Sequence, residues 1–165
     1  MRRTMIPVFL CIVLFMSSGF ASPSFDDFNG NKRSIEDFTG NGKWLVVMIW
    51  AHDCHVCNQE AHQYVAFHNK HKDKDAVILG LSIDGQAGKA KAEAFIKRHR
   101  LSFPNVLGEA EQVITMVDDL TGESNFATPS FLVYNPQGKL LAQQTGAVPP
   151  ALIEKFMQQE AASTQ

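Results

Sequence analysis

Two cysteines, Cys54 and Cys57, are the residues whose type and spacing most clearly indicate chemistry in this chain. Residues three apart in a first helical turn can bring their side chains within disulfide distance with little backbone movement. A bridge between them closes so short a loop that it adds little stability through loop entropy. A disulfide that contributes so little to stability is a candidate for a redox-active disulfide, which forms and breaks during turnover. The pair therefore indicates thiol–disulfide exchange.

The expected place of Cys54 at the start of a helix favours its thiolate form. Unpaired backbone N–H groups and the positive end of the helix dipole stabilise a negative charge there. Cysteines in such positions have pKa values of roughly 3.5 to 7.5, instead of about 8.5. We therefore expect Cys54 to be the exposed nucleophile and Cys57 to be the more buried resolving thiol.

Two neighbours of Cys54 would change its pKa in opposite directions. A carboxylate at Asp53 opposes the thiolate, whereas a protonated imidazole at His55 favours it. Because the sequence places both signs of charge beside the nucleophile, it leaves the reduction potential of the cysteine pair open.

Other interpretations of the C-x-x-C spacing stay open at this point. Half of a zinc site has the same spacing, so a metal or haem site, or an inert structural bridge, would use the same residues. The chain has no second C-x-x-C, and several nearby histidines would point around a helix instead of converging. We expect no metal and no cofactor beyond the redox-active disulfide. The nearby histidines are His52, His55, His62, His68 and His71, of which the last two are expected on a solvated helix end.

The elements that must position the cysteines alternate between strand and helix. A continuous apolar run rich in β-branched residues predicts a strand buried on both faces just before Cys54, and a second such run follows. Helical spacing without Gly or Pro predicts a helix that begins beside Cys54. This alternation implies parallel strands joined by right-handed crossovers. The predicted strands are 44–50 and 76–82, and the predicted helices are 55–71, 87–100 and 110–120.

The two ends of this region differ in kind from its centre. Near the C-terminus, two β-type runs flank Asn135-Pro136-Gln137-Gly138, which predicts a hairpin. A pair of prolines then opens a last helix, after which the chain should fray. The turn-rich segment before the first strand suits a hairpin or short strands. The ranges are 130–134 and 139–143 for the hairpin, 149–159 for the helix, 161–165 for the fraying end, 104–108 for a loop and 22–43 for the turn-rich segment.

The first residues have the layout of a secretory signal peptide. A basic stretch precedes an apolar run from Ile6 to Met16 and a small, polar segment that ends at Ala21. The apolar run is shorter than the roughly 20 residues that span a membrane, although an uncleaved anchor stays open. Removing residues 1–21 from the 165 leaves 144, which is enough for one domain over residues 22–165. The third cysteine would leave with the signal.

Charge excludes one class of partner. The formal net charge is −2 and the isoelectric point is near 6.3. No basic cluster is present that could follow a phosphate backbone. We therefore expect no nucleic-acid partner.

Residues 50–60 read Trp-Ala-His-Asp-Cys-His-Val-Cys-Asn-Gln-Glu. They resemble the W-A-x-W-C-x-x-C-x-x-E segment of the exported TlpA-like thioredoxins, a group that includes cytochrome c maturation reductases. Residues 127–133, Ala-Thr-Pro-Ser-Phe-Leu-Val, look like the thioredoxin loop in which a cis-proline faces the disulfide. The similarity covers essentially all of residues 22–165. It implies an α/β thioredoxin fold, with a central mixed β-sheet flanked by helices and an N-terminal β extension.

The resemblance also implies roles for individual residues. A substrate peptide would lie across the loop of Thr128 and Pro129, with Pro129 in the cis form. Trp50 would join the substrate-binding surface by shielding the disulfide, although packing explains this residue equally well. Glu60 would accept a proton from Cys57, or else would be a solvated helix glutamate. The chain departs from the family at Asp53, which stands where a tryptophan is usual, and at His62, which stands where a proline is usual.

These features predict an exported thiol:disulfide oxidoreductase that reduces disulfides of periplasmic client proteins and is recharged by a membrane electron-donor protein. An oxidase or isomerase, coupled to a membrane electron acceptor, would use the same two cysteines in another direction. A non-enzymatic metal-binding or metal-delivery module is the alternative from another class. The sequence determines neither the client protein nor the oligomeric state.

Overall fold

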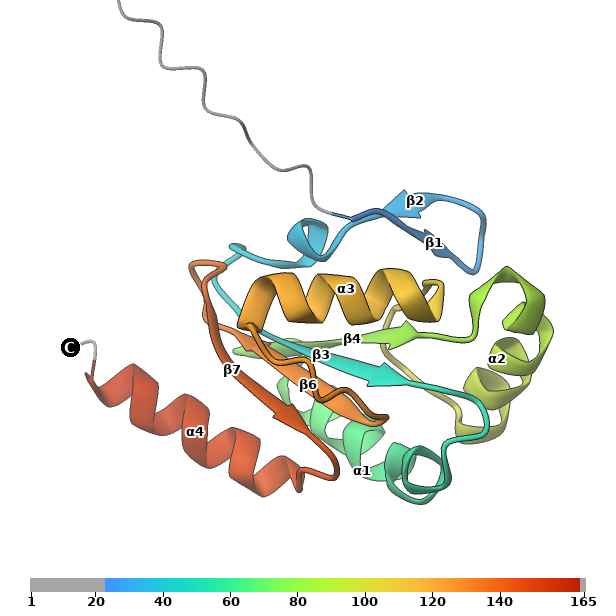
Figure 1. Ribbon diagram of the computed structural model, residues 1–165. Coiled ribbons are helices and arrows are strands. Elements are labelled where there is room, and N and C mark those ends of the chain that lie inside the picture. The colour runs from blue at the N-terminus through green and yellow to red at the C-terminus, as the bar shows by residue number, and fades with distance from the viewer. Residues whose placement is uncertain (1–22, 164–165) are drawn as a thin grey trace, which may run out of the picture.

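A seven-stranded mixed β-sheet lies at the centre of the protein in this computed structural model, which describes residues 23–163 (Figure 1). The strand order is β2-β1-β5-β4-β3-β6-β7. The strands are β1 (Phe25–Asp27), β2 (Lys32–Arg33), β3 (Trp44–Trp50), β4 (Ala76–Ser82), β5 (Asn105–Leu107), β6 (Ser130–Tyr134) and β7 (Leu140–Thr145). The expected signal peptide, residues 1–21, lies outside the described residues. Within residues 23–163, no helix is both long enough and apolar enough to cross a membrane.

The pairing pattern confirms the expected mixed sheet with an N-terminal β extension. Strands β3, β4 and β5 run parallel to one another, whereas β6 and β7 join the β3 edge in antiparallel fashion. The short strands β1 and β2 add an antiparallel edge next to β5. Because β3 and β4 are parallel and in register from Trp44–Ala76 to Trp50–Ser82, their carboxyl ends meet at one edge of the sheet.

Helices cover both faces of this sheet. The apolar side chains of α1 (His55–His71), α2 (Gly85–His99) and α4 (Pro150–Ser163) join one core. Those of α3 (Ala110–Thr121) and of the 3₁₀ helix η1 (Ile35–Phe38) join the other. Figure 1 shows α3 and α1 on opposite sides of the strands.

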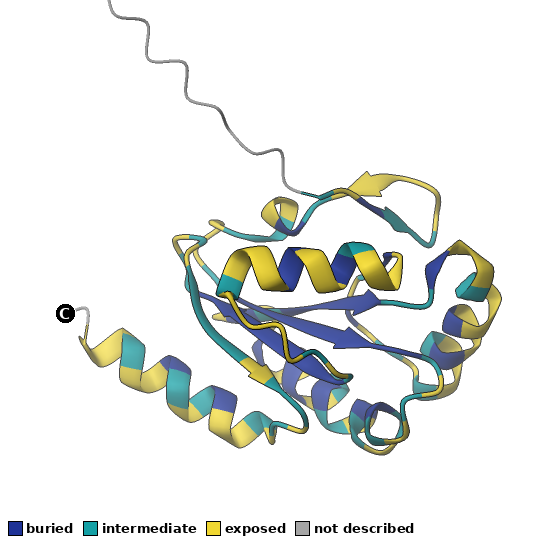
Figure 2. Cartoon of the chain, viewed as in Figure 1, coloured by how far each residue is buried: buried dark blue, intermediate teal, exposed yellow. Residues whose placement is uncertain are grey.

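Strand β3 is buried along its whole length because it supplies both cores (Figure 2). Its even-numbered side chains, from Trp44 to Trp50, pack beneath α1, α2 and α4. Its odd-numbered side chains, from Leu45 to Ile49, pack against α3. A central strand of a parallel sheet that is covered on both faces needs apolar residues at every position, which explains the continuous apolar run.

The predicted boundaries of β3, β4 and α1 are confirmed, but two other predictions were wrong. The expected loop over 104–108 contains strand β5, whose three residues are too few to show a period in the sequence. Helix α4 continues through Ser163 instead of ending near Gln159, and two alanines with high helix propensity extend it.

The expectation that His68 and His71 lie on a solvated helix end was also wrong, because this end of α1 packs beneath β4 and α4. The two residues are only 5% and 9% exposed. His68 Nδ1 accepts a hydrogen bond of 3.1 Å from the backbone N–H of Ile78 in β4. The ring nitrogens of His71 bind Asp75 at 2.7 Å and Glu154 of α4 at 3.1 Å.

The environment of His68 predicts a pH-dependent loss of stability. Burial, followed by the charge of Lys72, lowers the pKa of His68. The unfolded chain, with a histidine pKa of about 6.5, therefore binds a proton at pH values where the folded chain does not. The free energy of unfolding should fall as the pH drops below about 6.5, by at most about 1.4 kcal/mol per pH unit.

Urea unfolding at several pH values tests this prediction. His68→Gln should flatten the dependence of the unfolding free energy on pH, whereas His55→Gln, at the exposed first position of the same helix, should leave it unchanged. Equal slopes for the two variants would contradict the assignment to His68.

Candidate active site

Cys54 and Cys57 form a disulfide at the start of α1, with Cα atoms 5.2 Å apart. Cys54 is the N-cap residue, and its Sγ accepts a hydrogen bond of 3.1 Å from the backbone N–H of Cys57. Cys57 is fully buried within the core below α1, whereas Cys54 is partly exposed. A reacting sulfur from another protein therefore has access only to Cys54.

The connection from β3 to Cys54 is held in place by the side-chain amide of Asn58. Its Nδ2 donates hydrogen bonds to the backbone oxygens of His52 at 3.1 Å and Cys54 at 2.9 Å. His99 of α2 donates from Nε2 to the Oδ1 of Asn58 at 2.9 Å. Burial, followed by the charges of Arg98 and His62, lowers the pKa of His99. Helices α1 and α2 thus fix the turn from one side.

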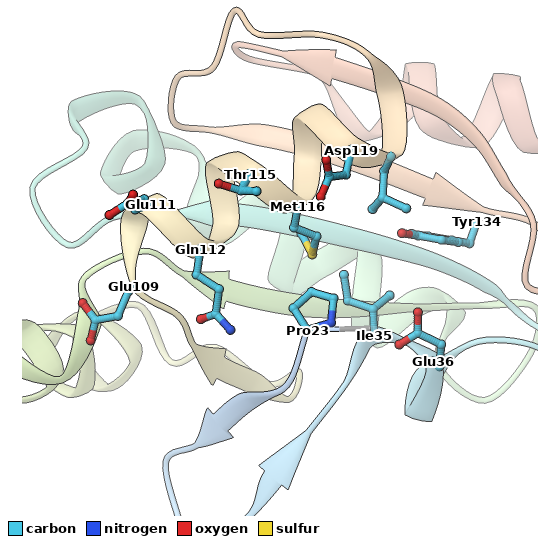
Figure 3. Close-up of a pocket in the computed structure, with 11 residues that line it drawn as sticks. Pro23, Ile35, Glu36, Glu109, Glu111, Gln112, Thr115, Met116, Asp119 and Tyr134 are labelled. Carbon is cyan, nitrogen blue, oxygen red and sulfur yellow. The ribbon is translucent and has the colours of Figure 1, made fainter. Parts of the chain in front are cut away.

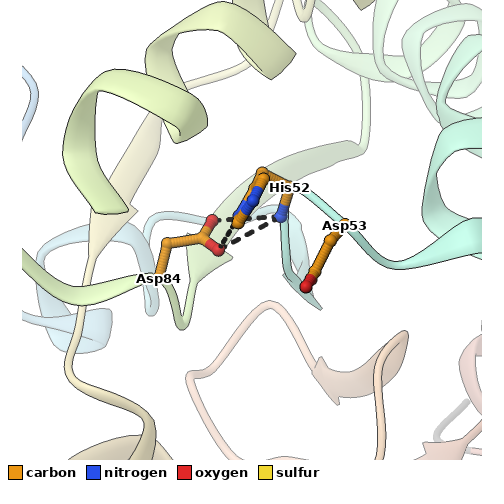
Figure 4. Close-up of side chains that lie close together, drawn as sticks. All are labelled: His52, Asp53 and Asp84. Atoms are coloured by element: carbon orange, nitrogen blue, oxygen red, sulfur yellow. Dashed lines mark hydrogen bonds and ion pairs between the residues drawn. The ribbon is translucent and has the colours of Figure 1, made fainter. Parts of the chain in front are cut away.

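A second set of hydrogen bonds fixes the same turn from the side of β4 (Figure 4). The carboxylate of Asp84, whose side chain is 5% exposed, accepts hydrogen bonds from the backbone N–H of His52 and, at 2.5 Å, from its Nδ1. The hydroxyl of Ser82 donates to the other oxygen of Asp84 at 2.6 Å. The buried carboxylate is therefore fully paired, as burial of a charge requires.

Sequence reasoning missed the contact between His52 and Asp84. A signal was available, because Asp84 follows β4 just as His52 follows β3. The carboxyl ends of neighbouring parallel strands share one edge of the sheet and bring such residues together. Polar residues after successive parallel strands would have identified the pair.

His52, Asp53 and Asp84 are also a group whose ligand atoms lie within 4.8 Å of one another, as a metal ion would require. The oxygens of Asp84 already accept hydrogen bonds from His52 and Ser82, so these contacts account for the arrangement. The two cysteines do not belong to this group. Asp53 and His55, the two residues expected to tune the nucleophile, are both exposed beside Cys54.

Glu60 lies one helical turn beyond Cys57 and is partly exposed. The hydroxyl of Tyr64 lies 3.5 Å from Glu60 Oε2 but donates its short hydrogen bond, of 2.6 Å, to the backbone oxygen of Val148. Burial, followed by the negative charge of Glu60, raises the pKa of Tyr64. The contact between Glu60 and Tyr64 is therefore the longer of the two that the Tyr64 hydroxyl makes.

The peptide bond between Thr128 and Pro129 is cis. Pro129 immediately precedes β6, whose first residue, Ser130, pairs with Ile49 near the end of β3. Ser130 Oγ donates a hydrogen bond of 2.5 Å to the oxygen of Ala127 and so closes the loop. The loop thus lies at the sheet edge from which the connection to Cys54 leaves.

Trp50 does not belong to a substrate-binding surface, which corrects the expected role of this residue. It is fully buried and stacks on Phe95 of α2, with ring centroids 4.4 Å apart. Its Nε1 donates a hydrogen bond of 3.2 Å to the side chain of Asn105 in β5. As an even-numbered residue of β3, Trp50 points into the core instead of toward a client protein.

Comparison with known proteins places this geometry in a family. Residues 19–143 match the AhpC/TSA family. Thiol-disulfide oxidoreductase ResA of Bacillus subtilis is 28% identical over 148 residues, which cover 86% of this chain and 75% of that protein. A peroxiredoxin of Ignicoccus hospitalis is 30% identical over 122 residues, which cover 69% of this chain and 50% of that protein.

A solved structure agrees with these relatives. A thiol:disulfide interchange protein from a Bacteroides species has a TM-score of 0.63 and 26% identity, and the match covers 83% of this chain and 88% of that chain. The thioredoxin domain of a thiol-disulfide oxidoreductase from Bacteroides vulgatus shares the fold with a TM-score of 0.66, at 24% identity and with 82% and 92% coverage. The chain therefore belongs to the AhpC/TSA family and is a thiol–disulfide oxidoreductase with the thioredoxin fold.

Proposed function

We propose that the protein reduces disulfide bonds of exported client proteins, with Cys54 as the nucleophile and Cys57 as the resolving thiol. The unequal burial of the two sulfurs carries this assignment: Cys54 is partly exposed at the N-cap of α1, and Cys57 is fully buried. The sulfur of Cys54 can therefore react with a sulfur of another protein. The sulfur of Cys57 is shielded from such a reaction and can react only with Cys54.

The reaction consists of two exchanges that together move two electrons to the client. The Cys54 thiolate attacks one client sulfur, a mixed disulfide forms, and the second client sulfur leaves as a thiolate that takes up a proton. Cys57 then loses its proton and attacks the Cys54 sulfur, which releases the client as a dithiol and leaves the enzyme oxidised. Glu60, one turn along α1, is the acceptor that we assign to the Cys57 proton.

The client peptide is placed on the loop of Thr128 and Pro129 in this proposal. Thr128 is partly exposed, whereas Pro129 is buried. Pro129 immediately precedes Ser130, the first residue of β6, which pairs with Ile49. This position at the edge of the sheet beside the Cys54 connection supports binding of an extended segment there.

The carboxylates near Cys54 support the reducing direction, whereas a protonated His55 would act against it. Asp53 directly precedes the nucleophile, and Asp84 binds the residue two positions before it. Negative charge close to a thiol disfavours the thiolate of the reduced enzyme. When the thiolate is less stabilised, the reduced form of the enzyme is less stable relative to the oxidised form. It then donates electrons more readily, as a disulfide reductase must.

The cellular setting completes the proposal. The signal-peptide layout of residues 1–21 and the resemblance to exported thioredoxins support a periplasmic location. A membrane protein that supplies electrons would then reduce the Cys54–Cys57 disulfide after each turnover.

The reduction potential of the Cys54–Cys57 pair tests the direction of electron flow. Titration of residues 22–165 against glutathione and dithiothreitol buffers should give a value below about −200 mV, as for reducing members of this fold. A value near −120 mV would instead identify an oxidase, because oxidants of this fold lie there.

Single-cysteine variants test the order of attack. Reduced Cys57→Ser should accumulate a mixed disulfide with a disulfide-bonded client such as insulin, because the resolving thiol is missing. Cys54→Ser should accumulate none, since Cys57 is buried. Non-reducing electrophoresis separates the two results, and equal trapping by both variants would refute the assigned roles.

A matched pair of carboxylate variants tests the effect of charge on Cys54. Asp53→Asn and Asp84→Asn each remove a negative charge near the nucleophile and should raise its thiolate fraction at a fixed pH. Asp84→Asn should in addition lower the free energy of unfolding by about 1–3 kcal/mol, because an NH2 group replaces one of the two oxygens that accept from His52 and Ser82. Ultraviolet absorbance of the thiolate and urea unfolding measure the two effects, and an unchanged thiolate fraction in both variants would exclude this electrostatic role.

A further inference from the structure

A pocket of about 970 Å³ lies between α3 and the N-terminal segment (Figure 3), and neither Cys54 nor Cys57 lines it. No residue assigned to the redox site lines it. Figure 3 shows side chains from α3 on one side and Pro23, Ile35 and Glu36 on the other, with Tyr134 of β6 at one end. The α3 side of the sheet thus carries a hollow that the redox chemistry does not use.

The walls of the pocket combine apolar surface with acidic groups. Ile35, Met116 and Tyr134 form its inner, buried part, and Leu120 at its edge is 45% exposed. Four carboxylates belong to the lining, and none of the described lining residues is basic. The carboxylates are those of Glu36, Glu109, Glu111 and Asp119.

The acidic character extends beyond the pocket. All fifteen lysines and arginines of the chain lie outside the stretch from Leu101 to Gly138, which contains α3 and the loop after it. The same stretch contains five carboxylates, at Glu109, Glu111, Asp118, Asp119 and Glu123. Within the lining, burial and then the charge of Glu36 raise the pKa of Tyr134 to about 12. A surface of one sign next to an apolar hollow attracts partners of the opposite sign.

One end of the pocket lies next to Asp84, which holds the turn before Cys54. Glu109 pairs with Asp84 through an isolated antiparallel bridge, and its carboxylate accepts a hydrogen bond of 2.9 Å from the backbone N–H of Gln86. Asp84 in turn binds His52, two residues before Cys54. Glu109 at this end of the pocket is thus joined through Asp84 and His52 to the turn that precedes Cys54.

We propose that this pocket is a docking site for a basic segment of the client protein, which places an apolar side chain against Leu120 and cationic side chains against Glu111 and Asp119. The inference rests on the proposed function, because it concerns the proteins that Cys54 attacks. It adds a substrate class to that function: clients in which lysine or arginine and apolar residues lie near the disulfide.

Binding of cysteine-free peptides tests docking separately from redox chemistry. The probes are a fluorescent peptide of alternating lysine and leucine and a matched peptide of alternating glutamate and leucine, each titrated with the oxidised protein. We expect the lysine peptide to bind at least about tenfold more tightly at low salt, with the difference shrinking as salt screens the charges. Equal affinities for the two peptides would overturn the proposal.

Charge reversal locates the binding. Glu111→Lys combined with Asp119→Lys should weaken binding of the lysine peptide about tenfold or more, since repulsion replaces attraction at two exposed positions. Asp73→Lys combined with Glu93→Lys changes the net charge equally at exposed positions outside the pocket and should leave binding nearly unchanged. An equal loss in both double variants would show attraction by net charge alone and would also overturn the docking site.

Reduction assays connect the pocket to the reaction and separate the two proposals. Disulfide-bonded versions of both peptides are reduced by the enzyme with dithiothreitol as the electron donor, so that no donor protein takes part. The lysine version should show the higher kcat/KM, and the variant with Glu111→Lys and Asp119→Lys should lose that preference. Tight binding without reduction would contradict the proposed reductase while supporting the docking site. Reduction of both peptides at equal rates would support the reductase and contradict the docking site.

Discussion

The burial of β3 on both faces is the constraint on which the other features of this protein depend. The strand supplies alternate side chains to two cores, and it pairs in parallel with β4 and in antiparallel with β6. This arrangement brings the carboxyl ends of β3 and β4 and the start of β6 to one edge of the sheet. Cys54, Asp84 and Pro129, which are far apart in the sequence, therefore gather around a single redox centre.

Two networks of hydrogen bonds then convert that edge into a defined site. Asn58 and His99 hold the turn before α1 from the side of the helices, and Asp84 holds His52 from the side of the strands. The nucleophile is placed at a helix N-terminus, which favours a thiolate, and beside carboxylates, which oppose it. In the proposed function, the balance of these two effects favours the reducing direction of the exchange.

The α3 side of the sheet adds a surface of a different kind. Its acidic groups and apolar pocket lie on the opposite side of the strands from α1, yet Glu109 connects them to Asp84 and hence to the redox turn. One edge of the sheet thus serves two purposes: the strand ends position the sulfurs, and the loop that leads into α3 extends the surface that a client can contact.

The sequence alone determined the features that depend on local pattern. Strands β3 and β4 and helix α1 were predicted at their observed boundaries, because continuous apolar runs and helical spacing report directly on burial and period. The cysteine pair and the proline loop were recognisable from short motifs.

Tertiary structure alone decided what depends on contacts between distant segments. Trp50 and His68 are buried because of the helices and strands that cover them, and a local pattern cannot distinguish an aromatic shield from a core residue or a buried histidine from a solvated one. The pairing of His52 with Asp84 exists only once β3 and β4 lie side by side, since 32 residues separate the two side chains along the chain.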